Sequence, residues 1–147
     1  MSKPNILFIL VDALRASSVG CYGYTRQTTP NIDAVAKRGA AFEKVFCSVN
    51  ASDPSLTTMM TGLYPRTHGI IHHGNQIPEE EIENFTNSGI KLLPEILKEN
   101  GYKTYGLDWM GRWHKRGYDY YAGFNVDRAG RKKLLGSFSD FTAKIGL

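Results

Sequence analysis

The chain is poor in cysteine and has no long hydrophobic run. Its two cysteines, Cys21 and Cys47, are too few for a disulfide framework, so we expect a reducing, cytoplasmic compartment. The longest apolar run, residues 6–11, is far shorter than the roughly 20 residues of a membrane helix. It also lacks the basic flank and small-residue cleavage site of a secretory signal. We therefore expect neither a membrane span nor a disulfide-stapled secreted domain.

The sequence also has no strong excess of positive or negative charge. Lys and Arg number 18 against 14 Asp and Glu, a net charge of +4. This surplus suits an anionic substrate, and an ordinary solvated surface explains it equally well. The basic residues are scattered and no nucleic-acid motif accompanies them, so we expect no nucleic-acid partner. With 147 residues, of which 41% are hydrophobic, the chain is long enough for one globular domain with a real core.

The first half of the sequence alternates between strand and helix patterns. Residues 6–11 form a continuous apolar run, typical of a strand buried on both faces of a parallel sheet. A helix is predicted over 29–38, with Thr29 as its cap and Pro30 in its first position. A second strand is predicted over 42–49. Short links between these elements favour right-handed βαβ units, hence an α/β fold with a mostly parallel sheet flanked by helices.

Asp12 follows the first predicted strand directly. A carboxylate at the carboxyl end of a central strand lies where open α/β sheets bind their ligands. It is also a hard oxygen donor that suits Ca²⁺ or Mg²⁺. A helix-capping or loop aspartate is an equally good interpretation from the residues alone.

A short helix is predicted to follow Ser52. Asp53 is a good N-cap, Pro54 fits the first helical position and Gly62 fits the position after the end. Four apolar residues at helical spacing predict a buried stripe: Leu56, Met59, Met60 and Leu63. The Ser52 hydroxyl would then lie at the positive end of the helix dipole, where it could attack an anionic ester. The alternative is an ordinary capped helix.

The middle of the chain offers weaker signals. His72 and His73 are neighbours, but no Cys or Asp is spaced to complete a zinc set, so we interpret them as loop histidines. An acidic cluster is interpreted as a solvated helix start or loop; it consists of Glu79, Glu80, Glu81 and Glu83. A further helix is predicted around residues 92–97, with Pro94 in its opening turn and Gly101 at its end.

A strand predicted over 102–107 leads to a second candidate group. Asp108 ends this strand, and Arg112 and His114 follow two residues apart, so both could reach one pocket if that segment is extended. Arginine binds anionic oxygens through its fork of donors, and histidine can transfer a proton near neutral pH. The alternative is a pair of surface residues beside a buried Trp113. Near the end of the chain, Phe138, Phe141 and Ile145 could form one face of a last helix.

Several motifs follow one another in a recognisable order. They are Lys3-Pro4-Asn5-Ile6, Val11-Asp12-Ala13-Leu14-Arg15, Gly20-Cys21-Tyr22-Gly23, Thr29-Pro30-Asn31-Ile32-Asp33, the stretch from Ser52 with Thr61-Gly62-Leu63-Tyr64-Pro65, and Gly111-Arg112-Trp113-His114. In this order they resemble the N-terminal part of the sulfatase family, within the alkaline-phosphatase superfamily. The resemblance covers about residues 3–124. It implies an N-terminal sulfatase-like α/β domain over 1–124, incomplete relative to the family, and a basic C-terminal segment over 125–147.

The resemblance also implies roles for four residues. Asp12 would ligate a divalent cation, usually Ca²⁺ in sulfatases, with Mg²⁺, Mn²⁺ or Zn²⁺ as alternatives. Ser52 stands at the nucleophile position of the Cys/Ser-x-Pro-x-Arg signature, where the family oxidises its residue to formylglycine. Arg112 stands where a lysine usually contacts the sulfate group, and His114 where a histidine usually assists the chemistry. The expected substrate is a small anionic ester.

The sequence departs from the family at three points. Ala13 replaces the second aspartate of the metal pair, and Leu56 replaces the signature arginine, which argues against formylglycine at Ser52. The downstream Asp-His-Gly segment is missing, so we expect a fragment or truncated member with little activity alone. Two alternatives stay open: a phosphodiester or phosphonate ester hydrolase that uses Ser52 directly, and a catalytically silent domain that binds an anion or a partner. An incomplete sheet edge could also promote self-association. The central expectation is that Asp12, Ser52 and His114 converge at one rim of the sheet.

Overall fold

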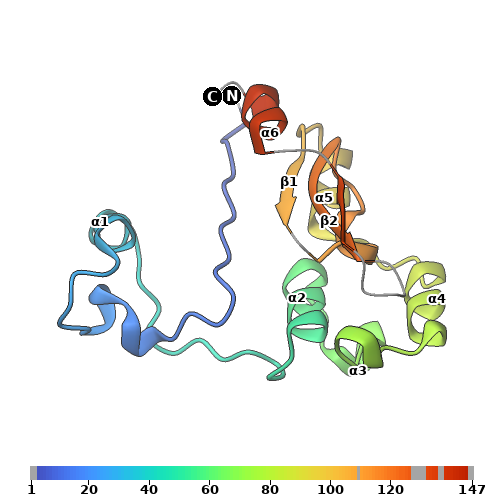
Figure 1. Ribbon diagram of the computed structural model, residues 1–147, viewed down its shortest axis with the longest axis horizontal. Helices are drawn as coiled ribbons and strands as arrows, with labels where there is room; N and C mark the ends of the chain where they lie inside the picture. The colour runs from blue at the N-terminus through green and yellow to red at the C-terminus, as the bar shows by residue number, and fades with distance from the viewer. Residues whose placement is uncertain (1–2, 109, 127–131, 136–137, 146–147) are drawn as a thin grey trace. The chain divides into compact units, whose positions relative to one another are not determined.

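The computed structural model describes residues 3–108, 110–126, 132–135 and 138–145 (Figure 1). The chain divides into two compact units, Met1–Phe46 and Cys47–Leu147, and each is described by itself. The boundary expected near residue 124 lies inside a strand of the second unit.

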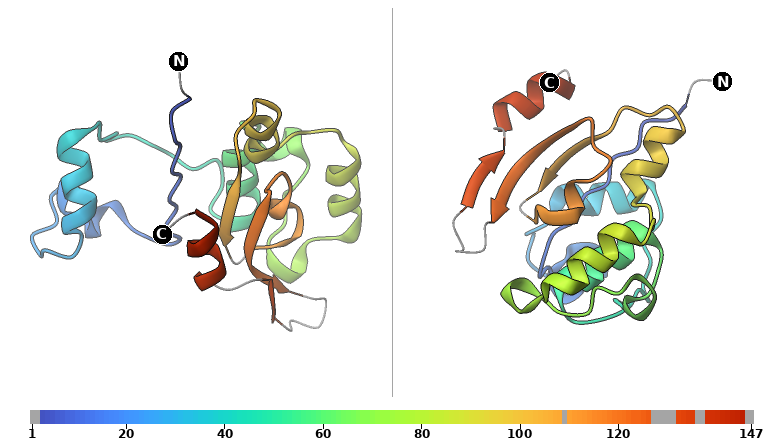
Figure 2. Two further views of the ribbon diagram at one scale, coloured as in Figure 1. Left: turned by 90° about the horizontal axis from the view of Figure 1, so that it is seen from above. Right: turned by 90° about the vertical axis from the view of Figure 1, so that its right-hand side faces the viewer.

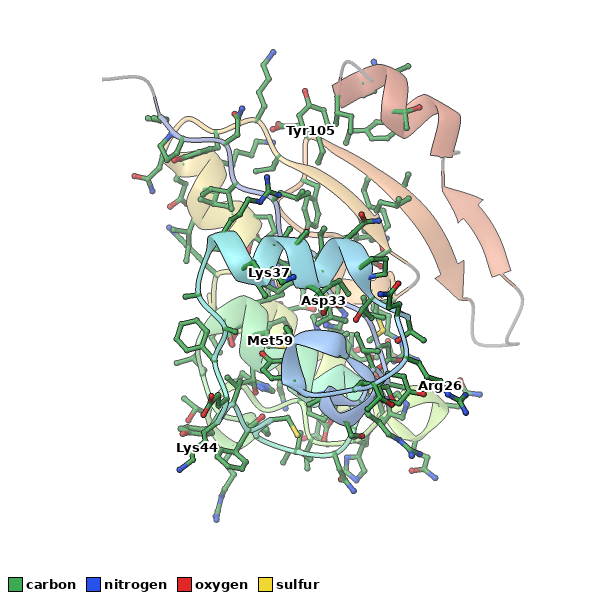
Figure 3. The ribbon with its side chains drawn as sticks, turned by 90° about the vertical axis from the view of Figure 1, so that its left-hand side faces the viewer. Arg26, Asp33, Lys37, Lys44, Met59 and Tyr105 are labelled. Carbon is green, nitrogen blue, oxygen red and sulfur yellow. The ribbon has the colours of Figure 1, made fainter. Side chains whose placement is uncertain are left out.

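The first unit is built around one α-helix. Two 3-10 turns, η1 (Ala16–Ser18) and η2 (Gly20–Tyr22), precede α1 (Pro30–Arg38). Pro30 opens α1 and basic residues end it, as the sequence predicts. Asp33, which Figure 3 shows on α1, accepts a hydrogen bond from the backbone N–H of Cys21 at 2.7 Å. The Thr29 hydroxyl accepts one from the N–H of Gly20 at 2.9 Å rather than capping the helix. These two bonds hold η2 against the start of α1.

The two strands predicted in the first half of the chain do not form in the structure. Residues 6–11 adopt no regular structure, and their apolar side chains are exposed, Leu7 to 84%. Residues 42–49 likewise form no strand, and Phe46 is 87% exposed. A parallel strand buried on both faces needs hydrogen-bonded neighbours and covering helices. Neither segment pairs with a strand among the described residues, so both predictions are wrong here.

The second unit carries most of the regular structure. Its helical elements are α2 (Ser52–Thr61), α3 (Pro65–His68), η3 (Gly74–Gln76), α4 (Glu79–Asn87), α5 (Leu93–Glu99), η4 (Arg112–Lys115) and α6 (Phe138–Ile145). Gly62 ends α2 in the left-handed conformation with φ 71°, as predicted. Pro94 lies in the first turn of α5, and the acidic cluster begins α4. No helix in the described part of the chain is long and apolar enough to cross a bilayer.

A three-stranded mixed sheet forms one side of the second unit (Figure 2). β1 (Tyr105–Asp108) pairs in parallel with β2 (Tyr120–Val126), and β2 pairs antiparallel with β3 (Lys132–Leu135). β1 confirms the strand expected before Asp108, whereas the sequence patterns do not predict β2 and β3. The loop from β1 to β2 contains η4, so a 3-10 turn replaces the usual crossover helix. The fold is α/β, with helices and a parallel strand pair.

The core of the second unit lies between these helices and the β1–β2 loop. Its buried side chains are Ile70, Phe85, Leu92 and Trp113, with Met60, Ile77, Ile82 and Ile90 packed against them. The apolar stripe predicted for α2 is only partly buried: Met60 packs against the core, but no residue of the stripe is fully buried. Met59 is 42% exposed, whereas the buried residues of α2 are Asp53, Pro54 and Thr57. α2 therefore directs polar side chains inward, and these contact η4.

Candidate active site

The site is built around the first two turns of α2. Ala51 is extended, with φ −129° and ψ 138°, and Ser52 is the first helical residue. The predicted N-cap at Asp53 is wrong, because the helix already begins at Ser52 and Ala51 takes the N-cap position. Asp53 lies inside the first turn instead, and its carboxylate turns toward the rest of the unit.

Asp53 is a buried carboxylate with three partners. It is only 3% exposed. Its Oδ2 accepts hydrogen bonds from Nδ1 of His73 at 2.6 Å and from the backbone N–H of Gly74 at 2.8 Å. Its Oδ1 lies 3.4 Å from Nη1 of Arg112. Buried charges in proteins are stable when they are paired and hydrogen-bonded, and Asp53 meets both conditions. It thereby joins α2, the η3 loop and η4.

Arg112 is held over the start of α2 by two groups. Besides Asp53, its Nη2 donates a hydrogen bond to the carbonyl oxygen of Gly74 at 2.9 Å. Its guanidinium carbon lies 6.0 Å from the centre of the Trp113 ring. Arg112 has φ 46°, in the left-handed region that residues other than glycine rarely adopt. Such backbone conformations are costly and are concentrated at functional sites.

His114 contacts the same helix one turn later. Its Nε2 lies 3.3 Å from the hydroxyl of Thr57, which also accepts a hydrogen bond from the indole N–H of Trp113 at 2.9 Å. His114 is 6% exposed and Thr57 is fully buried. Burial lowers the pKa of His114 to about 4, with the nearby carboxylates of Asp53 and Asp108 acting in the opposite direction. His114 is therefore neutral at pH 7, with one unprotonated ring nitrogen that can accept a hydrogen bond.

The structure brings together some of the predicted site residues. Arg112 and His114 both contact α2, the helix that Ser52 begins, and their contacts go to Asp53 and Thr57 rather than to the Ser52 side chain. Arg112 and His114 lie in a 3-10 turn and not in the extended segment that the prediction assumed, and a pocket shared by the two stays a prediction. Asp12 is exposed and belongs to the first unit, so its convergence with Ser52 and His114 stays a prediction.

Asp12 by itself does not make a metal site. Ca²⁺ takes six to eight oxygen ligands. In the ranges that the structure describes, no three His, Cys, Asp or Glu side chains gather into a metal-binding group. The residue after Asp12 is Ala13, with φ 58°, and it offers no side-chain ligand. The described residues therefore do not fit a complete cation cage, and we derive no chemical step through a metal.

Three residues of the site were not predicted for their roles. Asp53 was expected to cap α2, His73 was expected to be an ordinary loop histidine, and Thr57 was not singled out. His73 does lie in a loop, as does His72, whose Nδ1 pairs with Glu81 at 2.7 Å. A signal for Thr57 was present, since it lies four residues after Asp53 and so shares its helix face. No local signal marks His73.

The protein is of the α/β class and has a candidate site for an anionic ester. In this site an arginine and a buried neutral histidine contact the first turns of a helix that begins with serine. The comparison with family models narrows this class. The model described as Sulfatase matches residues 4–133, and the chain belongs to the sulfatase family. The expected resemblance is confirmed, and the alkaline-phosphatase superfamily is consistent with it.

Individual relatives agree with this assignment. A sulfatase of Formosa agariphila is 33% identical over 143 residues, which cover 95% of this chain and 27% of the relative. An N-acetylgalactosamine-6-O-sulfatase of Bacteroides thetaiotaomicron is 34% identical over 114 residues, 76% of this chain and 20% of the relative. The N-acetylgalactosamine-6-sulfatase of Homo sapiens is 32% identical over 115 residues, 76% of this chain and 22% of the relative. The chain thus spans between 20% and 27% of the length of these curated relatives.

Proposed function

We propose that the chain is part of a hydrolase of sulfate esters, in which Ser52 is the nucleophile, His114 the proton acceptor and Arg112 the substrate-binding cation. One observation supports the proposal: Arg112 and His114, both in η4, contact the first two turns of the helix that begins with Ser52. Family membership supports the reaction class.

The proposed reaction uses the chemistry of these three side chains. The Ser52 oxygen attacks sulfur, its proton passes to the unprotonated nitrogen of His114, and the bond from sulfur to the ester oxygen breaks. His114 returns this proton to the ester oxygen, which leaves as the alcohol. Water then attacks the sulfur of the sulfated Ser52, which releases sulfate and restores the serine hydroxyl. Arg112 holds the anionic sulfate oxygens through its fork of N–H donors. The first N–H groups of α2 add to the stabilisation of negative charge, because they lie at the positive end of the helix dipole.

A divalent cation remains part of the proposal. Ca²⁺ comes first, with Mg²⁺, Mn²⁺ and Zn²⁺ as alternatives, and Asp12 is proposed as one of its ligands. The cytoplasmic location and self-association through a sheet edge also remain predictions. Size-exclusion chromatography at several concentrations would test the second of these.

The names of two relatives suggest a substrate class. They act by name on N-acetylgalactosamine-6-sulfate groups, and we propose sulfated sugars as the first class to test. The experiment measures sulfate released from N-acetylgalactosamine-6-sulfate by the chain, with Ca²⁺ added, and compares the Ser52→Ala and Ser55→Ala variants. Ser55 lies on the same helix outside the proposed machinery, so it is the matched control.

We expect low turnover, which falls to background in Ser52→Ala and stays at the starting level in Ser55→Ala. Turnover that survives Ser52→Ala would refute the role of Ser52. Mass spectrometry of the peptide around Ser52 provides a separate test. We expect the mass of unmodified serine, whereas a loss of two hydrogens would indicate formylglycine.

A phosphodiester or phosphonate ester hydrolase is the second candidate. The observation that favours it is Leu56, which lies on α2 where the family signature has an arginine. An unmodified serine hydroxyl is a competent nucleophile for such esters. The same assay with phosphodiester and phosphonate substrates distinguishes the two, because a preference for either over the sulfate ester would favour this candidate. If none of the three esters is hydrolysed, a catalytically silent domain that binds an anion or a partner remains.

A further inference from the structure

The hydroxyl of Thr57 lies at the centre of a buried hydrogen-bond cluster. Three groups surround it: the backbone carbonyl oxygen of Asp53 at 2.7 Å, the indole Nε1 of Trp113 at 2.9 Å and Nε2 of His114 at 3.3 Å. A hydroxyl can donate one hydrogen bond and accept two. The three contacts therefore use its full capacity, and each direction can be assigned.

The directions of the three hydrogen bonds follow from the two partners that can only accept or only donate. A carbonyl oxygen can only accept, so at 2.7 Å the Thr57 hydroxyl must donate its proton to Asp53. The indole N–H of Trp113 can only donate, so Thr57 accepts from it. The hydroxyl then has no proton left for His114. For this contact to be a hydrogen bond, Nε2 of His114 must carry the proton and donate it.

The other ring nitrogen of His114 is left bare by this arrangement. Nδ1 is buried, and it has no hydrogen-bond partner among the described residues. Leaving a buried acceptor unsatisfied costs roughly 1–3 kcal/mol, and such a group calls for a ligand or a chemical role. Burial also keeps the ring neutral, since it lowers the pKa of His114 to about 4.

We propose that Thr57 is a positioning residue that fixes the tautomer of His114, so that Nε2 carries the proton and Nδ1 is presented as the free basic nitrogen. Its catalytic meaning rests on the proposed function, in which His114 accepts the proton of Ser52. The tautomer itself does not depend on that function. The bond to the Asp53 carbonyl oxygen sets the direction of the Thr57 hydroxyl proton, and Trp113 takes the other acceptor position of the hydroxyl oxygen.

The test uses nitrogen-15 NMR of the histidine rings at pH 7, with the His114 signals assigned from their loss in His114→Gln. In the unaltered chain we expect a protonated Nε2 that exchanges slowly with water and a bare Nδ1. Thr57→Ser keeps the hydroxyl and should preserve this spectrum. Trp113→Phe keeps the bond from Thr57 to His114 and should preserve the tautomer. Thr57→Val should speed exchange of the Nε2 proton and populate the form protonated at Nδ1.

Two results would overturn the proposal: a proton on Nδ1 in the unaltered chain, or a Thr57→Val spectrum identical to that of the unaltered chain. If Thr57→Val fails to fold, the unaltered chain and Thr57→Ser still decide the tautomer. Where sulfate release is measurable, Thr57→Val should lower kcat roughly tenfold with KM nearly unchanged. A chain without sulfatase activity but with the expected spectra would refute the proposed function and leave the tautomer assignment intact.

Discussion

Removing the Asp53 carboxylate tests whether the site is held together as described. Asp53→Ala deletes the acceptor of three contacts, to His73, Gly74 and Arg112. A hydrogen bond to a charged group contributes about 1.5–3 kcal/mol. The three do not add in full, because the side chains of His73 and Arg112 are 48% and 24% exposed and water replaces part of what they lose. We expect Asp53→Ala to lower the free energy of unfolding by about 2–4 kcal/mol.

Asp53→Asn separates charge from hydrogen bonding. The amide oxygen can still accept from the N–H of Gly74, whereas the attraction to Arg112 and His73 is lost. We expect this variant to lose about 1–2 kcal/mol, roughly half the effect of alanine. Glu83→Ala is the matched control, since it removes the same charge from an exposed position of α4. Surface substitutions of this kind usually stay within about 0.5 kcal/mol.

The assay is urea unfolding followed by tryptophan fluorescence, with the slope m compared between variants. An unchanged m shows that the midpoint shift reports stability and not a change in the surface exposed on unfolding. If Asp53→Ala unfolds within about 0.5 kcal/mol of the unaltered chain, as Glu83→Ala should, the carboxylate is not the joint between α2 and η4 that its contacts indicate.

Three further predictions use the same assay. The pKa of His114 is about 4 in the folded chain and about 6.5 in the unfolded chain, so the unfolded chain binds the proton first as the pH falls. The free energy of unfolding should therefore decrease between pH 6.5 and pH 4, by on the order of 3 kcal/mol. The dependence should flatten in His114→Gln, and a slope of the opposite sign would contradict the burial effect. Arg116→Lys should cost about 1–2 kcal/mol, because lysine cannot reproduce the two bonds to Glu95 at 2.8 and 3.2 Å; an unchanged midpoint would show that the fork is unimportant. Gly117→Ala should lower the free energy of unfolding by about 2 kcal/mol or more, because φ is 83° and a Cβ would lie 2.4 Å from the backbone nitrogen of Glu95. Gly62→Ala is the control: its φ is similar but the space around it is open, so it should cost about 1 kcal/mol. Equal losses in the two glycine variants would refute the steric part of this reasoning.

The helices could be predicted because their signals are local. Pro30 and Pro94 stand at first-turn positions where a missing N–H costs nothing, and Gly62 takes up a left-handed conformation after α2. Each signal acts within a few residues, so the sequence alone contains it. The start of α2 was misjudged because Asp53 suits a cap and a buried ion pair equally well, and only the position of Arg112 decides between them.

Sheet structure was harder to predict for a different reason. An apolar run such as residues 6–11 indicates a segment that favours burial, but not which segment covers it. In the structure it stays exposed, and the sheet forms instead from β1, β2 and β3. Strand pairing depends on partners distant in sequence, so an apolar run alone does not decide whether a strand forms.

In the candidate site, too, local patterns could be predicted and contacts between distant residues could not. The two-residue spacing of Arg112 and His114 suggested a shared pocket, and from η4 both side chains contact α2, at Asp53 and at Thr57. The contact from His73 to Asp53 joins residues 20 apart, and nothing in the local pattern marks it. Asp12 was assigned from its place after a predicted strand and from the family resemblance. The strand does not form, so the family resemblance alone supports the assignment, which stays a prediction.

The pairing of Asp53 with Arg112 also predicts which anions the site prefers. The Arg112 and Asp53 side chains approach to 3.4 Å, and unit charges about 4 Å apart interact by roughly 4 kcal/mol at an effective dielectric constant near 20. Asp53 offsets much of the attraction that Arg112 offers, so a second negative charge on the ligand gains little there and is repelled by the carboxylate. We expect methyl sulfate, a monoanion, to bind more tightly than the dianion of phenyl phosphate at pH 8, as followed by the Arg112 side-chain NMR signals. Asp53→Asn should remove this difference. Tighter binding of the dianion by the unaltered chain would show that Asp53 does not shape the charge preference of the site.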